Sequence, residues 1–435
     1  MKFISKIALT LVITAAASIT AAPLVFAKKD DKPKDSAPAA PAGPKLKLSK
    51  PFTAAYAPAL DALLKKKDFA AAKAAFPAAL AAATSEDDKY EAGIFAVNLG
   101  TQTKDVPLQK QGIDLLIASP LTPPQNKGLY QFQRAAWSYD AKDFAAAAVD
   151  LNKAYEMGYR KSEIELLIAN SLGQTKRYPE AVTWMRKYFA APKAPGQKIE
   201  ATTYALAANY ALKTKDAVSA NDFLKDLVRS SGKPEYWHDA LTILMRSRDM
   251  QLAELLDVYR LMRKTDALTY EQEYAGYAES ADARRYPAEV AEVISEGIAK
   301  GTVTKTNRNI TDAQQLANSL LAEDLKTLAG TETAAKASAN GYQISLSADA
   351  LFSHKEYARA KAMYELALSK GGLRDKDGTD QTDRVNMRLA QSKIGLGDMG
   401  GAKADLAKIT GVNRKAIADY WMIFVDQKMT QTPAA

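Results

Sequence analysis

The feature that most constrains this chain is a pattern that recurs 34 residues further along the sequence. Between Gly128 and Pro192, Phe144 aligns with Tyr178, and Ala147 aligns with Ala181. Each aromatic residue follows a short polar turn and precedes an alanine by three positions. A period of this length is typical of chains built from repeated pairs of helices. Because each pair packs mainly against its neighbours, the pattern predicts an extended array rather than one compact core.

The same register extends over most of the chain. The residues that open the second helix of successive units are Phe69, Val106, Phe144, Tyr178, Ala217, Met250, Tyr286, Tyr357 and Met399. Successive openers are 33 to 42 residues apart, except for one interval of 71. That interval is about two repeats long, so a degenerate helical unit is expected over 301–340.

A small residue follows most openers by three positions, where two helices of a pair would cross closely. These residues are Ala72, Ala147, Ala181, Ala220, Ala253, Ala360 and Ala402. Extra methylene groups at a packed crossing cost about 1–3 kcal/mol, which favours a small side chain there. Gln109 and Glu289 break this rule, so their two units are the least regular.

These landmarks resemble those of the tetratricopeptide repeat (TPR) family, with eight or nine units over 52–425. The best matches are 130–160, 162–192 and 342–371, although the family's early tryptophan and its glycine are mostly replaced. The resemblance implies an all-α fold, a right-handed α-solenoid whose first helices line a concave groove. A related family of helical-hairpin repeats gives much the same pattern and stays an alternative.

The first 27 residues predict export. Residues 1–27 begin with lysines, continue with a long apolar run and end in the small-residue cleavage site Val25-Phe26-Ala27. We expect cleavage after Ala27 and a periplasmic protein that keeps no membrane span; the alternative is an uncleaved anchor. The chain has no cysteine, which excludes a lipoprotein and a disulfide framework.

Five segments are expected after the signal peptide. The first is a disordered linker rich in Lys, Ala and Pro over 28–50. It is followed by an N-terminal repeat block over 51–300, the degenerate joint over 301–340, C-terminal repeats over 341–425 and a tail over 426–435. The formal net charge of +9 lies largely in the signal peptide and linker, so the helical body is nearly balanced. No dense basic stripe marks a nucleic-acid interface.

Motifs that suggest chemistry are weak in this sequence. Gly395, Gly397 and Gly400 have the spacing of a dinucleotide fingerprint, but they occupy the turn between two expected helices. The acidic loop that contains Asp375, Asp377, Asp380 and Asp383 lacks the Gly and Glu that an EF-hand needs. His238 and His354 lie too far apart for a helical zinc motif. We therefore expect no cofactor, no metal and no enzymatic activity. A hydrolase site built from two convergent carboxylates stays an alternative.

The strongest candidate for binding is a polar row on the first helices. Asn98, Asn170 and Asn209 each precede their opener by eight residues, and Gln102, Gln174 and Lys213 follow one helical turn later. Tyr139 and Arg246 lie nearby in other units. In the family that the chain resembles, this face lines the groove, and its asparagines often hold a ligand's backbone. An amide suits that role because it both donates and accepts hydrogen bonds.

The sequence thus predicts a non-enzymatic scaffold or adaptor that binds a protein or an extended peptide in its groove. The alternative is a cell-envelope protein that binds a carbohydrate, either an exopolysaccharide or cell-wall material. That alternative needs aromatic rings exposed in the groove, whereas Tyr155, Trp184 and Tyr188 are expected to pack between repeats.

Overall fold

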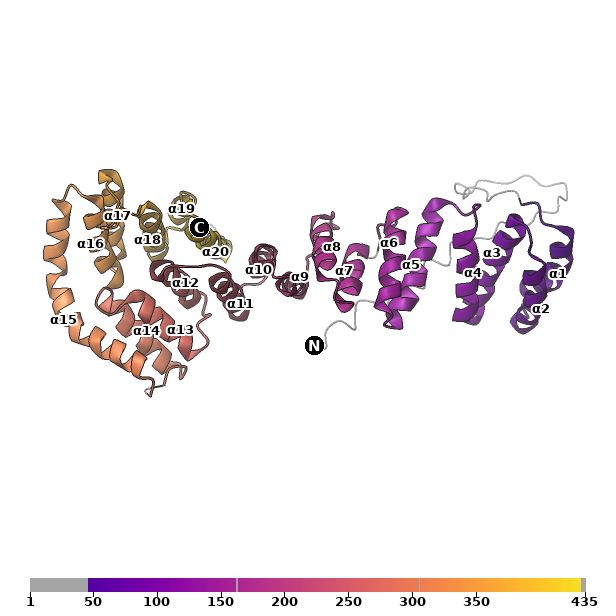
Figure 1. Cartoon of the computed structure of the whole chain (residues 1–435), viewed down its shortest axis with the longest axis horizontal. Coiled ribbons are helices and arrows are strands. Elements are labelled where there is room, and N and C mark those ends of the chain that lie inside the picture. Colours follow the sequence, from indigo (N-terminus) through magenta and orange to yellow (C-terminus); the bar gives the residue numbers. More distant parts are fainter. Residues whose placement is uncertain (1–45, 162, 305, 432–435) are drawn as a thin grey trace. The chain divides into compact units, whose positions relative to one another are not determined.

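The fold is seen in a computed structural model, which describes residues 46–161, 163–304 and 306–431. The predicted signal peptide and nearly all of the predicted linker lie outside these residues. The described chain is all-α and forms two compact units, unit 1 up to Lys193 and unit 2 from Ala194 (Figure 1). No helix in the described ranges is long and apolar enough to cross a membrane.

Unit 1 consists of four antiparallel helix pairs, of which the first carries a short π-helical turn, η2. Its elements are α1 (Lys50–Asp61), η2 (Ala62–Lys66), α2 (Phe69–Ala82), α3 (Glu86–Thr103), α4 (Val106–Ala118), α5 (Pro124–Asp140), α6 (Phe144–Glu156), α7 (Ile164–Gln174) and α8 (Tyr178–Ala190). Each second helix packs against the first helix of the next pair, so the pairs stack in chain order.

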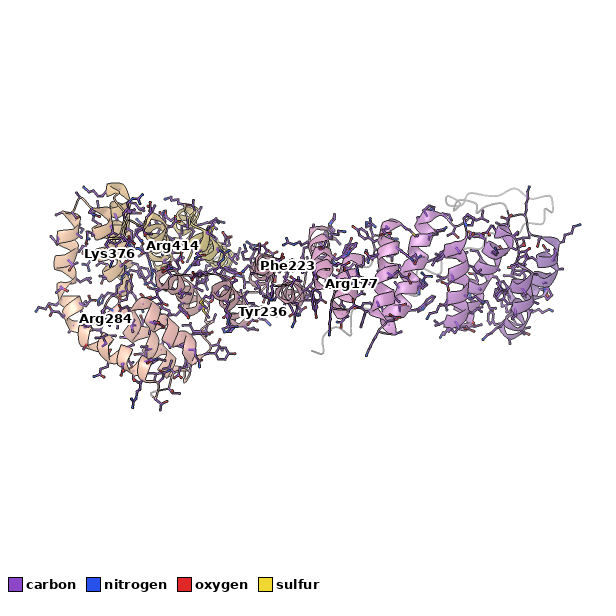
Figure 2. All side chains as sticks on the ribbon, viewed as in Figure 1. Arg177, Phe223, Tyr236, Arg284, Lys376 and Arg414 are labelled. Carbon is purple, nitrogen blue, oxygen red and sulfur yellow. The ribbon has the colours of Figure 1, made fainter. Side chains whose placement is uncertain are left out.

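Unit 2 contains five further helix pairs and two single helices. Its elements are α9 (Ala201–Lys213), α10 (Ala217–Ser230), α11 (Pro234–Arg246), α12 (Leu252–Lys264), α13 (Glu271–Ala281), α14 (Pro287–Ala299), α15 (Arg308–Lys336), α16 (Gly341–Ser353), α17 (Tyr357–Lys370), α18 (Thr382–Gly395), α19 (Met399–Leu406) and α20 (Val412–Gln431). The side chains of Arg284 and Arg414, labelled in Figure 2, belong to this unit. Together the nine pairs confirm the predicted all-α architecture of TPR-like repeats.

The predicted openers locate the second helices closely. Seven of the nine are the first residue of a helix, while α12 and α14 begin two and one residues after Met250 and Tyr286. A lysine with positive φ often stands two residues before the opener, as at Lys67, Lys142 and Lys215. The aspartate that follows such a lysine caps the helix, because its side chain accepts an amide hydrogen bond of the first turn.

The small residues after the openers are buried as predicted, with one exception. Six of the seven are fully buried, but Ala253 is partly exposed because α12 begins later than expected. The two irregular positions have specific partners. Gln109 fits against Gly100 of α3, and Glu289 forms a buried ion pair with Arg260.

The degenerate unit predicted over 301–340 is one uninterrupted helix, α15, of 29 residues. It packs against α13, α14 and α16, and only Ile310, Ala317, Leu328 and Ala335 of this helix are buried. Helical structure also continues further than expected, because the single helix α20 reaches Gln431, through most of the predicted tail.

Unit 2 closes into a ring of helices. Each of α12, α13, α14, α16, α18 and α20 packs against the next, and α20 packs back against α10 and α12 (Figure 1). Gln427 Nε2 donates to the Val228 carbonyl oxygen at 2.5 Å, and Trp421 Nε1 donates to the Asp257 carbonyl oxygen at 3.1 Å. The helix near the C-terminus therefore completes a unit that begins about 200 residues earlier.

Candidate functional site

Three of the predicted groove residues come together in unit 1. Asn170 of α7 donates from Nδ2 to the hydroxyl oxygen of Tyr139 on α5. Gln174, one turn further along α7, donates from Nε2 to Asn170 Oδ1 at 3.5 Å. Asn170 is buried, Tyr139 is half-buried and Gln174 is exposed. The row therefore joins the first helices of two successive pairs and ends in an exposed amide.

The Tyr139 hydroxyl is a neutral hydrogen-bonding group at physiological pH. Burial raises its pKa above the ordinary value, and the hydrogen bond from Asn170 opposes this shift only in part. A neutral hydroxyl keeps both donor and acceptor capacity, as the amide of Gln174 does. Tyr139, Asn170 and Gln174, here called the amide row, can therefore bind a peptide backbone, whose groups are both donors and acceptors.

The other five predicted residues lie outside the amide row. Asn98 is half-buried and Gln102 is exposed, both on α3 of unit 1. Asn209 and Lys213 of α9 and Arg246 of α11 are exposed and belong to unit 2. The predicted set is thus divided between the two units.

The aromatic residues of α6 and α8 are packed, as predicted. Trp184 and Tyr188 are buried, and Tyr155 contacts Trp184 edge-to-face with ring centroids 4.8 Å apart. The Arg160 guanidinium lies 3.5 Å from the centroid of Tyr155, and Lys187 Nζ lies 3.9 Å from that of Trp184. Rings covered in this way offer little area for stacking a sugar.

Sequence reasoning missed a buried ionic network in unit 2. Arg260 of α12 forms a two-point contact with Glu289 of α14, with Nε to Oε1 at 2.6 Å and Nη2 to Oε2 at 2.5 Å. The Tyr277 hydroxyl donates to Glu289 Oε1 at 2.6 Å. Burial and the nearby carboxylate raise the pKa of Tyr277 well above its usual value, so its hydroxyl remains a donor. Although burial alone would lower the pKa of Arg260, Glu289 raises it well above normal, and the guanidinium stays charged.

A second part of the network surrounds Asp349 of α16. Its carboxylate accepts from the hydroxyls of Tyr286 at 3.1 Å and Tyr364 at 2.6 Å, and from Arg384 Nη1 of α18 at 2.5 Å. Arg384 uses its other nitrogens as well, donating from Nη2 to Ser345 Oγ and from Nε to Gln381 Oε1. Every nitrogen of this guanidinium therefore has an acceptor.

The third part of the network connects α12 to α18 and α20 through Asp257. Its carboxylate accepts from Arg414 Nη1 at 2.5 Å and from Gln391 Nε2 at 3.1 Å. Arg388 Nη2 lies 3.4 Å from Asp257 Oδ1. Side chains from helices far apart in the sequence thus meet inside the ring.

One pattern in the sequence indicates the buried network. Arg384 and Arg388 are four residues apart on α18, among the buried Val385, Leu389 and Ala390. Charged residues in an apolar register are rarely buried without partners. The sequence does not identify those partners, because they lie up to about 130 residues away, as Asp257 does from Arg388.

The motifs that the sequence analysis judged weak have structural roles. Gly397, with φ of +80°, forms the turn between α18 and α19, as predicted. Asp375 accepts hydrogen bonds from the amides of Asp377 and Thr379 within its loop. His238 and His354 pair with Glu273 and Asp324 at 2.8 Å and 2.6 Å. No group of three or more potential metal ligands occurs within the described ranges.

Comparison with known proteins finds similarity only among solved structures. No protein-family model matches the chain, and no curated protein matches its sequence. The TPR2AB-domain:pHSP90 complex of yeast Sti1 is 16% identical, covering 70% of this chain and 96% of that one, with a TM-score of 0.20. The P58(IPK) TPR domain is 14% identical, covering 88% and 99%, with a TM-score of 0.20. Yeast Tom70 is 13% identical, covering 88% and 97%, with a TM-score of 0.20. The fold assignment rests on the helix pairs themselves.

Proposed function

We propose that this chain is a non-enzymatic scaffold of the bacterial periplasm that binds a protein or an extended peptide. The observation that carries the proposal is the amide row, in which Asn170 of α7 bonds to Tyr139 of α5 and accepts from the exposed Gln174. A row of neutral donors and acceptors recognises backbone groups without requiring one side-chain sequence. Stacked helix pairs extend such a surface over several units and bind through many weak contacts.

The carbohydrate alternative receives less support from the same region. Stacking on sugars requires exposed aromatic faces. Trp184 and Tyr188 are buried, and cationic side chains lie over Tyr155 and Trp184. We therefore retain the protein or peptide as the proposed partner.

An affinity capture from the envelope fraction tests the scaffold function, with the chain from Lys28 onward as bait. The test variant is Gln174→Ala, which removes the exposed amide at the end of the row. The matched control is Gln111→Ala, an exposed glutamine on α4, the second helix of its pair. A protein captured by the wild type and by the control, but depleted at least tenfold with the test variant, supports the function. Equal capture by all three proteins contradicts it.

Periplasmic export is tested on the chain itself. We expect the mature protein to begin at Lys28 and to be released with the periplasmic fraction. Intact-mass measurement of the purified native protein checks this. A mass that includes residues 1–27 would contradict cleavage.

A further inference from the structure

The network of unit 2 joins three buried carboxylates to three buried guanidinium groups and one that is partly exposed, while the exposed Arg285 lies 3.5 Å from Asp349 at its edge. Its carboxylates are Asp257, Glu289 and Asp349, each at most 5% exposed. Its guanidinium groups are those of Arg260, Arg384 and Arg388, together with Arg414, whose side chain is 11% exposed. Arg260 is neutralised by Glu289 and Arg384 by Asp349. Asp257 is left to balance both Arg388 and Arg414.

Arg388 is the arginine that lacks a full partner. Arg414 Nη1 lies 2.5 Å from Asp257, whereas Arg388 Nη2 lies 3.4 Å away. Arg388 is 1% exposed, and its Nε and Nη1 have no hydrogen-bond partner among the described residues. An uncompensated buried charge costs several kcal/mol, and unpaired donors add to that cost. A bound anion would supply the missing countercharge.

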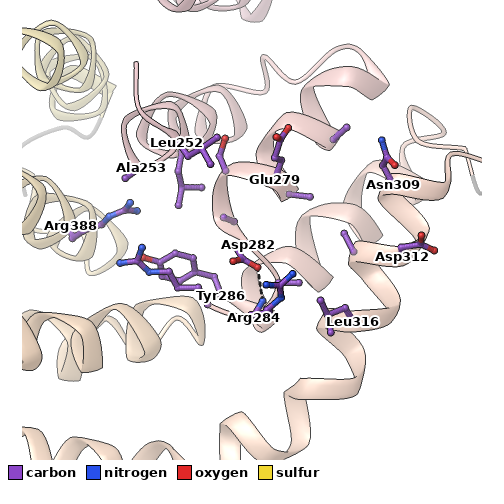
Figure 3. Close-up of a pocket in the computed structure, with 18 of the residues that line it drawn as sticks. Leu252, Ala253, Glu279, Asp282, Arg284, Tyr286, Asn309, Asp312, Leu316 and Arg388 are labelled. Atoms are coloured by element: carbon purple, nitrogen blue, oxygen red, sulfur yellow. Dashed lines mark hydrogen bonds between the residues drawn. The ribbon is translucent and has the colours of Figure 1, made fainter. Parts of the chain in front are cut away.

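A cavity of about 670 Å³ lies beside Arg388. Figure 3 shows the Arg388 guanidinium directed from α18 toward the space beside Leu252 and Tyr286. Residues of α13 and the turn after it form about half of the wall, and Leu252 and Leu256 of α12 and Ala313 and Leu316 of α15 add apolar side chains. This volume is within the range of pockets that hold small molecules.

The charges at the edge of the cavity differ from those inside it. Glu279, Asp282 and Asp312 line it together with Arg284 and Arg285, and all five are exposed. Exposed charges are screened by water and salt, so they influence a ligand weakly. The buried charged side chains that line the cavity are Arg384, which is paired with Asp349, and Arg388.

We propose that this cavity binds a small molecule with a carboxylate group, which pairs with Arg388, and an apolar body, which packs against α12 and α15. A single carboxylate carries the one negative charge that the network lacks. It also gives Arg388, whose nearest carboxylate oxygen in the network is 3.4 Å away, a charge-assisted partner. The site lies in unit 2 and is independent of the amide row of unit 1.

Calorimetric titration of the full chain with hexanoate tests the site, with hexanamide and inorganic phosphate as comparison probes. We expect one hexanoate to bind per chain and neither comparison probe to bind. Arg388→Met removes the charge at similar volume and should weaken hexanoate binding 10- to 100-fold, the usual range for a charge-assisted hydrogen bond. Absence of hexanoate binding, binding of phosphate alone, or equal binding by the variant overturns the proposal.

The stability of the ligand-free variant separates a binding role from a structural one. Replacement of an uncompensated buried charge by an apolar side chain is often neutral or stabilising. We therefore expect the melting temperature of Arg388→Met to equal or exceed that of the wild type. The control Arg384→Met removes a guanidinium with three hydrogen-bonded nitrogens and should lower the melting temperature. A similar fall in both variants would show that Arg388 is only structural, and would overturn the proposal.

Hydrogen exchange locates the bound probe. Asn309, Asp312 and Leu316 of α15 line the cavity. Hexanoate should slow amide exchange over 309–316 in the wild type and leave it unchanged in Arg388→Met. Slowing elsewhere without slowing at 309–316 contradicts the assignment.

Discussion

Gln109 of α4 lies directly against Gly100 of α3. Its Nε2 donates to the Gly100 carbonyl oxygen at 2.8 Å, and a Cβ at position 100 would lie 2.8 Å from Gln109 Cγ. The absent side chain at Gly100 thus makes room for the large one at Gln109. Helices α3 and α4 therefore still cross closely, because the small residue of the crossing lies on α3 rather than on α4.

Gly100→Ala should therefore destabilise unit 1. The added methyl group must displace Gln109 and break its hydrogen bond, so we expect a loss of about 1–3 kcal/mol in free energy of unfolding. The control is Gly330→Ala on α15, where a Cβ meets nothing within 4 Å. That change should stabilise the helix by about 0.5–1 kcal/mol. Denaturant unfolding measures both changes in free energy of unfolding. A Gly100→Ala variant as stable as the wild type would contradict the close contact between Gly100 and Gln109.

Glu289→Ala should destabilise unit 2 severely. It leaves Arg260 charged and buried, and we expect a loss of about 3–5 kcal/mol. The control Glu365→Ala removes a surface partner of Lys361 and should cost under about 1 kcal/mol. Calorimetry checks the prediction, since the unit 2 transition should move while that of unit 1 stays. Equal effects of the two substitutions would be inconsistent with a buried network.

The long helix α15 should be the least stable part of unit 2. Only four of its 29 residues are buried, whereas nine of the 13 residues of α16 are buried. Local opening costs less where few apolar contacts are lost. Native-state hydrogen exchange should be faster over 318–330 than over 344–352. Slower exchange in α15 would show that its exposed face is covered.

Stability of unit 1 should fall in acid through Asp88. Its carboxylate accepts hydrogen bonds from the amides of Ser49 and Ser85 at 2.8 Å and 3.2 Å. Although burial opposes the shift, these bonds hold its pKa below the ordinary value. A lowered folded-state pKa gives stability that is present above the unfolded pKa, near 3.9, and is lost as pH falls through the folded pKa.

Asp88→Asn is the variant that tests this acid dependence. It should be less stable than the wild type at pH 7 and lose less stability below about pH 4. Thermal melts between pH 7 and pH 2 provide the comparison. Parallel curves for the two proteins would show that another carboxyl group is responsible.

Local patterns allowed the helix pairs to be predicted from sequence. Phe144 and Tyr178 each begin a helix as expected, because the turn before them and the alanine after them are set within a few residues. A lysine followed by an acidic residue, as in Lys67-Asp68 and Lys215-Asp216, was an additional turn signal that went unused.

Long-range packing could not be predicted in the same way. The contacts of α20 with α10 and α12, such as Gln427 with Val228, join residues about 200 positions apart. Repeat periodicity describes only neighbouring units. The cavity and the contact of Arg388 with Asp257 likewise join α18 to α12, about 130 positions apart, so they follow from the structure alone.

All three residues of the amide row were among the residues predicted to line the groove. Tyr139, Asn170 and Gln174 were placed on the correct helices, and the structure brings them together. The register also selected Asn209 and Lys213, which belong to the other unit.

Site-specific photocrosslinking tests the proposed scaffold function most directly. A photoreactive residue at position 174 or at the control position 111 is introduced into the full chain, which is then irradiated in intact cells. The account predicts that position 174 crosslinks to one reproducible envelope protein and that position 111 does not. Crosslinks to that protein from position 111 alone, or the same crosslinks from both positions, would contradict the amide row as the binding surface.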